Sequence, residues 1–130
     1  LVKVPGESNL GDFHYEVWDT KLSRQVKPKF LVQLCCYAEM LESIQGVRPQ
    51  NMAIVLGNQD QATFRVDDYF YYYQSLKRAF LTSQAEFNPD NEPALALSKN
   101  HGHWAGCAHE ILVERDHLSQ VATMSSTQIS

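Results

Sequence analysis

Residues 28–46 carry an apolar face that is too wide for a helix covered on one side only. Pro28 suits the first turn of a helix and Gly46 suits its end. Between them, apolar side chains recur at helical spacing at Phe30, Leu31, Leu34, Cys35, Tyr37, Ala38, Leu41 and Ile44. A face of this width predicts a helix that contacts more than one neighbouring element.

Short apolar segments on both sides of this helix indicate strands. Residues 1–4 and 13–20 predict a hairpin, with the turn-rich residues 5–12 between them. Residues 52–57 form a continuous apolar run that is typical of a buried strand. Residues 62–66 return after a polar turn and predict its antiparallel neighbour.

The rest of the chain predicts helices separated by an irregular segment. A second helix is expected from Asp67 or Asp68, either of which can cap it, to about residue 81. Residues 107–114 predict a further helix, and residues 115–124 a short one. The order β-β-α-β-β-α predicts an α/β or α+β fold with a mixed sheet flanked by helices.

The composition limits which class of protein this is. With 130 residues, 44% hydrophobic and 20% charged, the chain can form one domain with a real core. We expect that core at residues 1–81 and a C-terminal arm of the same domain at residues 82–130. The net charge of −4 gives no general attraction to nucleic acid, so such contact needs a local basic patch, metal ions or another part of a larger protein. No run approaches the roughly 20 apolar residues of a membrane span, so no membrane partner is expected.

The three cysteines indicate a reducing compartment. Cys35 and Cys36 are adjacent in the predicted helix, and Cys107 stands alone, which is not the pattern of a disulfide framework. We therefore expect a cytoplasmic protein with Cys35 and Cys36 in its core. The chain opens in a strand-like run, "LVKV", and we expect it to be a fragment of a longer protein.

Four polar side chains stand at spacings that packing alone does not explain. Asp19 and Lys21 share one face of the predicted strand near its C-terminal end, where α/β proteins commonly place their sites. Gln33 and Tyr37 lie one helical turn apart and point the same way. A carboxylate supplies hard oxygen to Mg²⁺ or Mn²⁺, and a nearby ammonium stabilises charge on a phosphate. The plainer alternatives are a surface ion pair and a polar edge of the core.

These residues together resemble the RecB-like branch of the PD-(D/E)XK nucleases. That branch has a strand ending in an acidic residue–x–Lys and a following helix with Q-x-x-x-Y, here "WDTK" and "QLCCY". The segments "YEVWDTKL", "DDYFYYYQSLKRAFL" and "RDHLSQVA" are also similar to the RecB-like nuclease family whose members often carry an additional RNase H-like domain. The resemblance covers nearly the whole chain and implies a PD-(D/E)XK restriction-endonuclease-like fold.

The resemblance implies metal-dependent hydrolysis of DNA, with Mg²⁺ or Mn²⁺ as cofactor, within a larger DNA-processing protein that has further domains. It makes Asp19 and the backbone carbonyl of Thr20 metal ligands and Lys21 the catalytic lysine. Gln33 and Tyr37 complete the catalytic site and, with Lys21, contact the nucleic acid.

The resemblance also implies one further carboxylate, on the strand before Asp19, which we expect just before Leu1. Without it, the 130-residue chain is expected to be nearly inactive as a nuclease. The alternative is a non-catalytic module, derived from such a nuclease, that binds nucleic acid or a protein. An unrelated structural domain is a third possibility.

Two other clusters carry functional hypotheses. His101, His103 and Cys107 could hold zinc, or could lie in a loop of solvated histidines. RecB-like proteins often bind an iron–sulfur cluster through cysteines in this region. Only Cys107 is present here, so we expect no such cluster.

The second helix carries the other cluster, an aromatic run followed by two cations. The five aromatic side chains of this run could stack bases, and the two cations beyond them could hold phosphates: Tyr69, Phe70, Tyr71, Tyr72 and Tyr73, with Lys77 and Arg78. The alternative is an amphipathic helix whose apolar residues pack against the sheet, namely Phe70, Tyr73 and Phe80.

Overall fold

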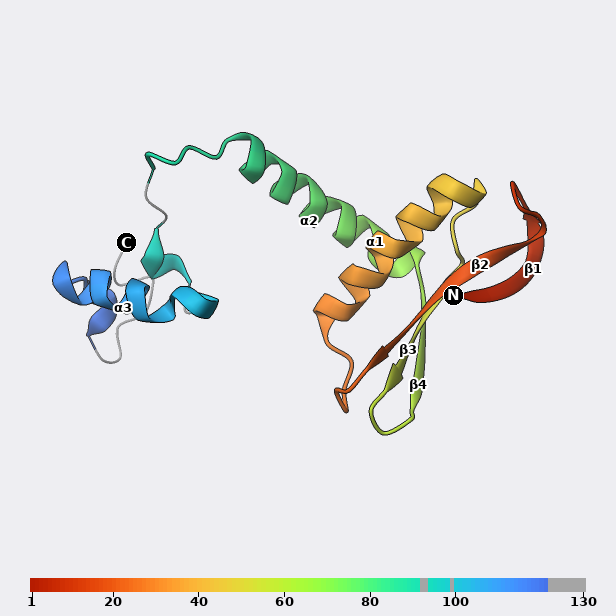
Figure 1. Ribbon diagram of the computed structural model, residues 1–130, viewed down its shortest axis with the longest axis horizontal. Coiled ribbons are helices and arrows are strands. Elements are labelled where there is room, and N and C mark those ends of the chain that lie inside the picture. The colour runs from red at the N-terminus through yellow and green to blue at the C-terminus, as the bar shows by residue number, and fades with distance from the viewer. Residues whose placement is uncertain (92–93, 99, 122–130) are drawn as a thin grey trace. The chain divides into compact units, whose positions relative to one another are not determined.

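A four-stranded mixed sheet with the order β1-β2-β3-β4 forms the centre of the first part of the chain (Figure 1). The computed structural model describes residues 1–91, 94–98 and 100–121. The strands are β1 (Val2–Ser8), β2 (Gly11–Lys21), β3 (Asn51–Leu56) and β4 (Gln61–Arg65). β1 and β4 pair antiparallel with their neighbours, whereas β2 and β3 are parallel. The predicted mixed sheet is therefore confirmed.

Strand β2 uses its two halves for different partners. Residues 11–16 pair with β1, and residues 17–21 pair with β3. Within the described residues, the edge of β2 that faces away from β3 has no strand partner at residues 18–21. The end of β2, which carries Asp19 and Lys21, is therefore open along this edge.

The hairpin of β1 and β2 has a shorter turn than the sequence predicts. β1 continues to Ser8 and β2 begins at Gly11, so the prediction of a turn over residues 5–12 was wrong. Pro5 and Gly6 stand inside β1, where the register shifts, and Gly6 has a φ of +145°. An irregularity in an edge strand accommodates both residues, which is why these turn formers do not end the strand.

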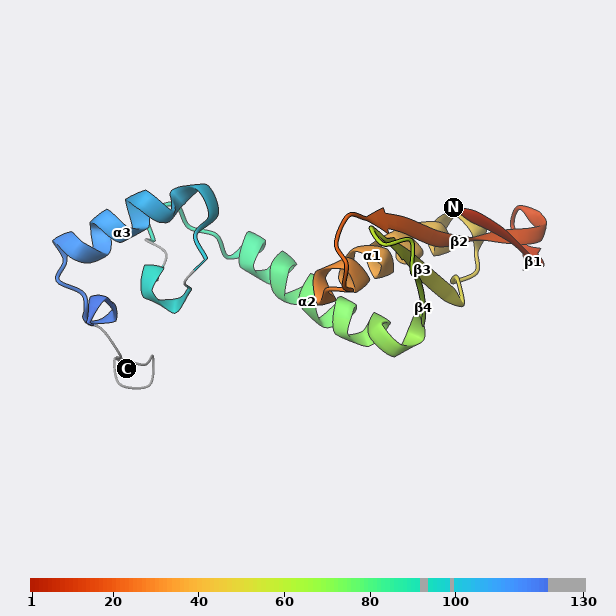
Figure 2. The same ribbon diagram turned by 90° about the horizontal axis from the view of Figure 1, so that it is seen from below.

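Helix α1 (Pro28–Gln45) connects β2 to β3 and covers one face of the sheet (Figure 2). It ends at Gly46, whose φ of +73° is left-handed and whose amide donates to the Glu42 carbonyl. Leu34 and Ala38 are fully buried in the core. The sheet covers one side of α1 and helix α2 (Asp67–Ala85) packs along another, which confirms the expectation drawn from its wide apolar face.

Helix α2 begins and ends differently from the prediction. Its N-cap is Val66, and within the described chain no side chain caps it. Asp67 and Asp68 lie in the first turn instead, where negative charge favours the helix dipole. The helix runs past residue 81 to Ala85 because no glycine or proline interrupts it.

The apolar side chains of α2 are divided between core and solvent. Phe70 and Tyr73 are buried. Phe80 is 62% exposed, so its predicted packing against the sheet was wrong. The difference arises because α2 packs mainly along α1 and, of the strands, mainly against β4.

The chain divides into two compact units, Leu1–Glu86 and Phe87–Ser130. The boundary comes directly after the end of α2, which continues past residue 81 to Ala85. That residues 82–130 form an arm of the same domain stays a prediction. The second unit contains helix α3 (Ala105–Glu114), which confirms the helix predicted at residues 107–114. It also contains the short 3₁₀ turns η1 (Leu95–Leu97), η2 (Gly102–Trp104) and η3 (Leu118–Gln120).

Of the helix predicted at residues 115–124, the described part forms only η3, and residues 122–124 lie outside the described residues. Across the part of the chain that the structure describes, no helix is both long enough and apolar enough to cross a membrane.

Candidate functional site

Asp19 and Lys21 form an ion pair at the end of β2. Side chains two residues apart on a strand share a face, and here that face is the one covered by α1. Asp19 Oδ2 lies 2.7 Å from Lys21 Nζ. The Lys21 side chain is 21% exposed and that of Asp19 is 28% exposed, so the pair is partly buried but open to solvent.

Lys21 extends from the strand to the first turns of α1. Its Nζ donates a hydrogen bond to Gln33 Oε1 at 2.8 Å and lies 5.2 Å from the centre of the Phe30 ring. Gln33 Nε2 in turn donates to the Tyr37 hydroxyl at 2.8 Å. The side chains of Asp19, Lys21, Gln33 and Tyr37 therefore form one continuous chain of contacts, and their predicted convergence is confirmed.

The carboxylate of Asp19 is oriented by the backbone. Its Oδ1 accepts a hydrogen bond from the Thr20 amide at 2.8 Å. Its Oδ2 is buried and, among the described residues, accepts no aligned hydrogen bond, although Lys21 Nζ is close. This oxygen thus keeps lone pairs that a cation can use.

The donors at Asp19 fit a weakly held hard cation. Carboxylate and carbonyl oxygens are the ligands that Mg²⁺ prefers, and this ion usually keeps several waters and takes one or two protein carboxylates together with substrate phosphate. Within the described residues, no three His, Cys, Asp or Glu side chains come together to hold a metal. Asp19 therefore suits an ion whose remaining positions are filled mostly by water and phosphate. The role of the Thr20 carbonyl as a second ligand stays a prediction.

The loop between β2 and α1, residues 22–27, is held against the end of β3. The amide of Gly57 donates to the Ser23 carbonyl at 3.1 Å. A Cβ on Gly57 would lie 2.5 Å from the carbonyl oxygen of Leu22, so a side chain does not fit here. Gly57 therefore fixes how the chain leaves Lys21. Sequence reasoning missed this role, although a glycine directly after an apolar strand is a signal of close backbone approach.

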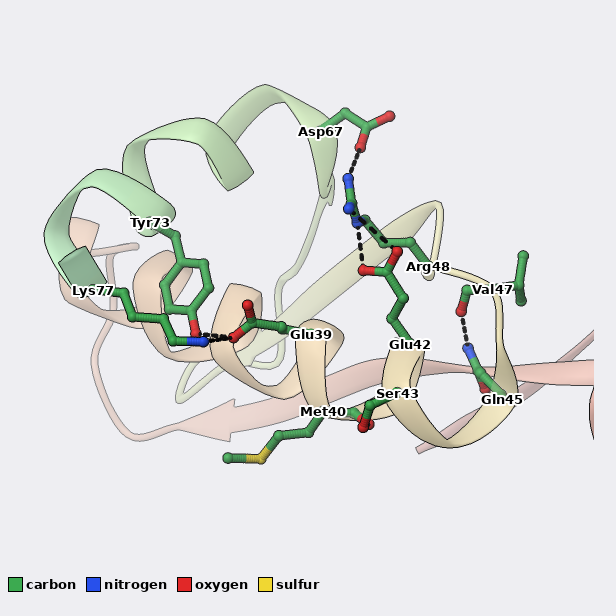
Figure 3. A network of polar contacts seen from close by, with 10 residues as sticks. All are labelled: Glu39, Met40, Glu42, Ser43, Gln45, Val47, Arg48, Asp67, Tyr73 and Lys77. Carbon is green, nitrogen blue, oxygen red and sulfur yellow. Dashed lines mark hydrogen bonds and ion pairs between the residues drawn. The ribbon is translucent and has the colours of Figure 1, made fainter. Parts of the chain in front are cut away.

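Gln45 attaches the other end of α1 to β2. Its side chain is fully buried. Its Oε1 accepts from the Tyr15 amide at 2.9 Å, and its Nε2 donates to the Tyr15 carbonyl at 3.2 Å. The same Nε2 donates to the Val47 carbonyl at 2.9 Å (Figure 3). Because the buried amide is fully paired, it stabilises the contact. Helix α1 is thus joined to β2 at both ends, by Lys21–Gln33 and by Gln45.

Charged side chains also join α1 to α2 (Figure 3). Lys77 Nζ and the Tyr73 hydroxyl both donate to Glu39 Oε2, each at 2.6 Å. These two hydrogen bonds hold the pKa of Glu39 below its ordinary value. Burial, and then the bond to Glu39, raises the pKa of Tyr73. Lys77, which the sequence offered as a phosphate contact, is therefore engaged in helix packing.

Arg48 forms a second junction between the same helices. Its Nε and one terminal nitrogen donate to Glu42 at 2.8 and 3.2 Å, and its other terminal nitrogen donates to Asp67 at 3.3 Å. The guanidinium also lies 3.8 Å from the centre of the Phe70 ring. Sequence reasoning missed Arg48, because partners 6 and 19 positions away have no recognisable spacing.

The predicted zinc ligands are not brought together in the described residues. His101 and Cys107 line one pocket of about 450 Å³ in the second unit, and the described lining does not include His103. The thiols differ in their surroundings. Cys107 is exposed, whereas burial and the neighbouring Cys36 raise the pKa of Cys35 to about 11. The absence of an iron–sulfur cluster stays a prediction.

Comparison of the chain with models of protein families, with curated proteins and with solved structures finds no match. What the site does is therefore inferred from its residues and their geometry. That geometry joins a metal-binding type of oxygen donor, a fixed ammonium and a pair of hydrogen-bonding side chains at an open end of β2.

Proposed function

We propose that the chain carries a RecB-like, PD-(D/E)XK-type nuclease site that hydrolyses DNA phosphodiester bonds with Mg²⁺ or Mn²⁺. The observation that supports this most is the chain of contacts from Asp19 through Lys21 and Gln33 to Tyr37. It joins the acidic residue–x–Lys pair of a strand to the Q-x-x-x-Y pair of the following helix. The parallel pairing of β2 and β3, with α1 between them, supports the same assignment of fold.

In this proposal, Asp19 and the backbone carbonyl of Thr20 hold the metal ion. When bound, the ion polarises the phosphate and lowers the pKa of a bound water. Asp19 is prepared for this by the Thr20 amide, which fixes one carboxylate oxygen and leaves the other without an aligned hydrogen bond.

Lys21 stabilises the negative charge that builds on the phosphate oxygens during attack. Gln33 Oε1 accepts a hydrogen bond from the Lys21 ammonium, and Gln33 Nε2 donates to the Tyr37 hydroxyl. The ammonium is therefore oriented before substrate binds. The Phe30 ring lies 5.2 Å from the ammonium and helps to hold it in this position. Such preorganisation lowers the barrier because the dipoles need not rearrange during the reaction.

The test compares cleavage of end-labelled DNA by the wild-type chain and by Asp19→Asn, in Mn²⁺, Mg²⁺ and EDTA. We expect weak cleavage that is strongest in Mn²⁺, absent in EDTA and lost in Asp19→Asn. Asp12→Asn is the matched control, because Asp12 is exposed on β2 and its loss changes the net charge equally. Cleavage that survives in EDTA or in Asp19→Asn would contradict the proposal.

A second candidate function is a non-catalytic module that binds nucleic acid. The observation that favours it is that Asp19 is already neutralised by Lys21, while the described residues offer no three-ligand metal group. The cleavage assay, combined with a measurement of DNA binding in EDTA, separates the two. DNA binding in EDTA without cleavage in Mn²⁺ supports the binding module, and cleavage that depends on Asp19 supports the nuclease.

A further inference from the structure

An apolar pocket of about 370 Å³ lies between Val26, in the loop before α1, and the first turns of α1 and α2. It is lined by Val26, Pro28, Leu31, Val32, Tyr69 and Tyr72. The Tyr69 ring is held by an edge contact with Phe64, at 5.8 Å between ring centres. Tyr72 is 56% exposed, so its ring is available to a ligand. The volume and the apolar, aromatic lining are those of a small-ligand site.

The chain that borders this pocket carries a run of positive charge. Residues 20–38 contain Lys21, Arg24, Lys27 and Lys29 but no Asp or Glu. Arg24, Lys27 and Lys29 are exposed, and no ion pair among the described residues involves them. This stretch is thus a local cationic surface on a chain whose net charge is negative.

The cationic stretch links the pocket to the proposed nuclease site. It begins at Lys21, which contacts Asp19 and Gln33, and it reaches the pocket at Val26 and Pro28. On α1, Leu31 lies about 160° around the helix from Gln33, so the pocket and the Gln33 contact lie on different sides of its first turns.

We propose that the pocket takes an unpaired base of a single-stranded nucleic acid whose phosphates lie along Arg24, Lys27 and Lys29. The inference rests on the proposed function, since it specifies the form of the substrate that reaches Lys21. A base inside a duplex is stacked on both faces and does not enter a pocket, whereas an unpaired base stacks on an available aromatic ring such as that of Tyr72.

Charge complementarity favours this occupant over an apolar peptide. A strand of nucleic acid presents a flat apolar base and a negative phosphate at every step, which match the pocket and the cations beside it. Asp68 is the exposed acidic residue closest in sequence to Tyr69 and Tyr72, and its negative charge repels a phosphate bound nearby. Asp68→Asn is therefore expected to tighten binding modestly.

The test measures binding by fluorescence anisotropy with the full chain in EDTA, where metal-dependent cleavage does not occur. Three probes are compared: a short single-stranded DNA, the same strand with abasic positions, and its duplex. We expect Tyr72→Ala to weaken binding of the base-bearing single strand about tenfold and to leave abasic binding unchanged. Tyr71→Ala is the control, because Tyr71 is 78% exposed on the same helix and does not line the described pocket. Tyr72→Phe keeps the ring and should bind like wild type.

Replacing Lys27 and Lys29 together by alanine should weaken the binding of both single-stranded probes equally and reduce the salt dependence of binding, because these residues contact phosphate.

Four results would each overturn the inference. Tyr72→Ala weakens the binding of base-bearing and abasic strands alike, or Tyr71→Ala has the same effect as Tyr72→Ala. The other two are that the duplex binds as tightly as the single strand, or that no probe binds. Base-dependent binding without Mn²⁺-dependent cleavage would refute the nuclease and keep the pocket. Mn²⁺-dependent cleavage without base-dependent binding would refute the pocket and keep the nuclease.

Discussion

Lys21 makes three contacts at once, to the Asp19 carboxylate, the Gln33 amide and the Phe30 ring. Its side chain is 21% exposed, so its charge is only partly screened by water. Removing the ammonium leaves the partly buried Asp19 carboxylate without its counter-charge. Lys21 therefore affects both the chemistry of the site and the electrostatics around Asp19. Lys3, by contrast, is exposed on β1 and its ammonium contacts the Phe13 ring instead.

Tyr73 carries a stability prediction at the same scale. Tyr73→Phe keeps the buried ring and removes the hydroxyl that donates to Glu39 at 2.6 Å. A hydrogen bond to a charged group contributes about 1.5–3 kcal/mol, so we expect a loss of this size in the free energy of unfolding. Chemical denaturation measures it. Tyr71→Phe, at a 78% exposed position, should leave stability unchanged, and equal losses in the two variants would contradict the prediction.

Glu39 makes the stability depend on pH. Hydrogen bonds from Lys77 and Tyr73 lower the pKa of Glu39 in the folded chain, so its stabilising effect is complete above its unfolded pKa of about 4.3. The effect is lost as the pH falls through the lower folded value. Glu39→Gln should therefore have a lower melting temperature than wild type at pH 7, and the difference should narrow below about pH 4. A difference that stays constant down to pH 3 would contradict this reading.

Single residues differ in how far the sequence reveals them. Strand and helix periods predict that Asp19 and Lys21 share a face, and that Gln33 and Tyr37 do. The expectation that these two pairs form one site came from the family resemblance. Arg48 was not predicted, since its contacts depend on how α1 and α2 pack and not on any local spacing. Tertiary contacts of this kind have no period in the sequence.

Among the secondary-structure elements, the end of β3 and the loop after β2 are tied together by Gly57. Its substitution by alanine places a Cβ 2.5 Å from the Leu22 carbonyl oxygen, which is a backbone atom and not the end of a flexible side chain. We expect Gly57→Ala to destabilise the chain by about 1–3 kcal/mol, as overpacking typically does. Because Leu22 follows Lys21, the variant should also weaken any activity that depends on Lys21.

The matched control is Gly106→Ala in α3, where an added Cβ meets no described atom within 4 Å. Alanine in a helix is favoured over glycine by about 1 kcal/mol, so this variant should be at least as stable as wild type. Thermal melts of both variants make the comparison. If Gly57→Ala melts like wild type, the close approach to Leu22 is not a constraint.

Element types were easier to predict than element ends. The strands and the helix at residues 28–45 follow from apolar periodicity, which burial against the core enforces. The end of β1 was missed because Pro5 and Gly6, which usually mark turns, are absorbed by an irregularity in an edge strand. The end of α2 was missed because nothing in residues 82–85 favours or opposes helix strongly.

For the whole molecule, the division after Glu86 places the candidate site and the adjoining pocket in one unit. That unit contains the main cluster of buried apolar residues, from Val17 on β2 to Tyr73 on α2. A chain of residues 1–86 is therefore expected to fold alone and to melt in one cooperative transition. Circular dichroism measures this. A broad, non-cooperative melt would show that residues 87–130 are needed for the first unit to fold.

The most direct test of the account is the Mn²⁺-dependent cleavage rate of single-stranded DNA for the full chain, Lys21→Ala and Lys3→Ala. The two variants lose the same charge, but only Lys21 contacts Asp19 and Gln33. With one fixed carboxylate at the site, the wild-type rate is expected to be low but measurable. The account predicts that Lys21→Ala loses cleavage at least a hundredfold, with Asp19→Asn equally impaired and Lys3→Ala unchanged. Equal rates for Lys21→Ala and Lys3→Ala, or no cleavage by any of the chains, would contradict it.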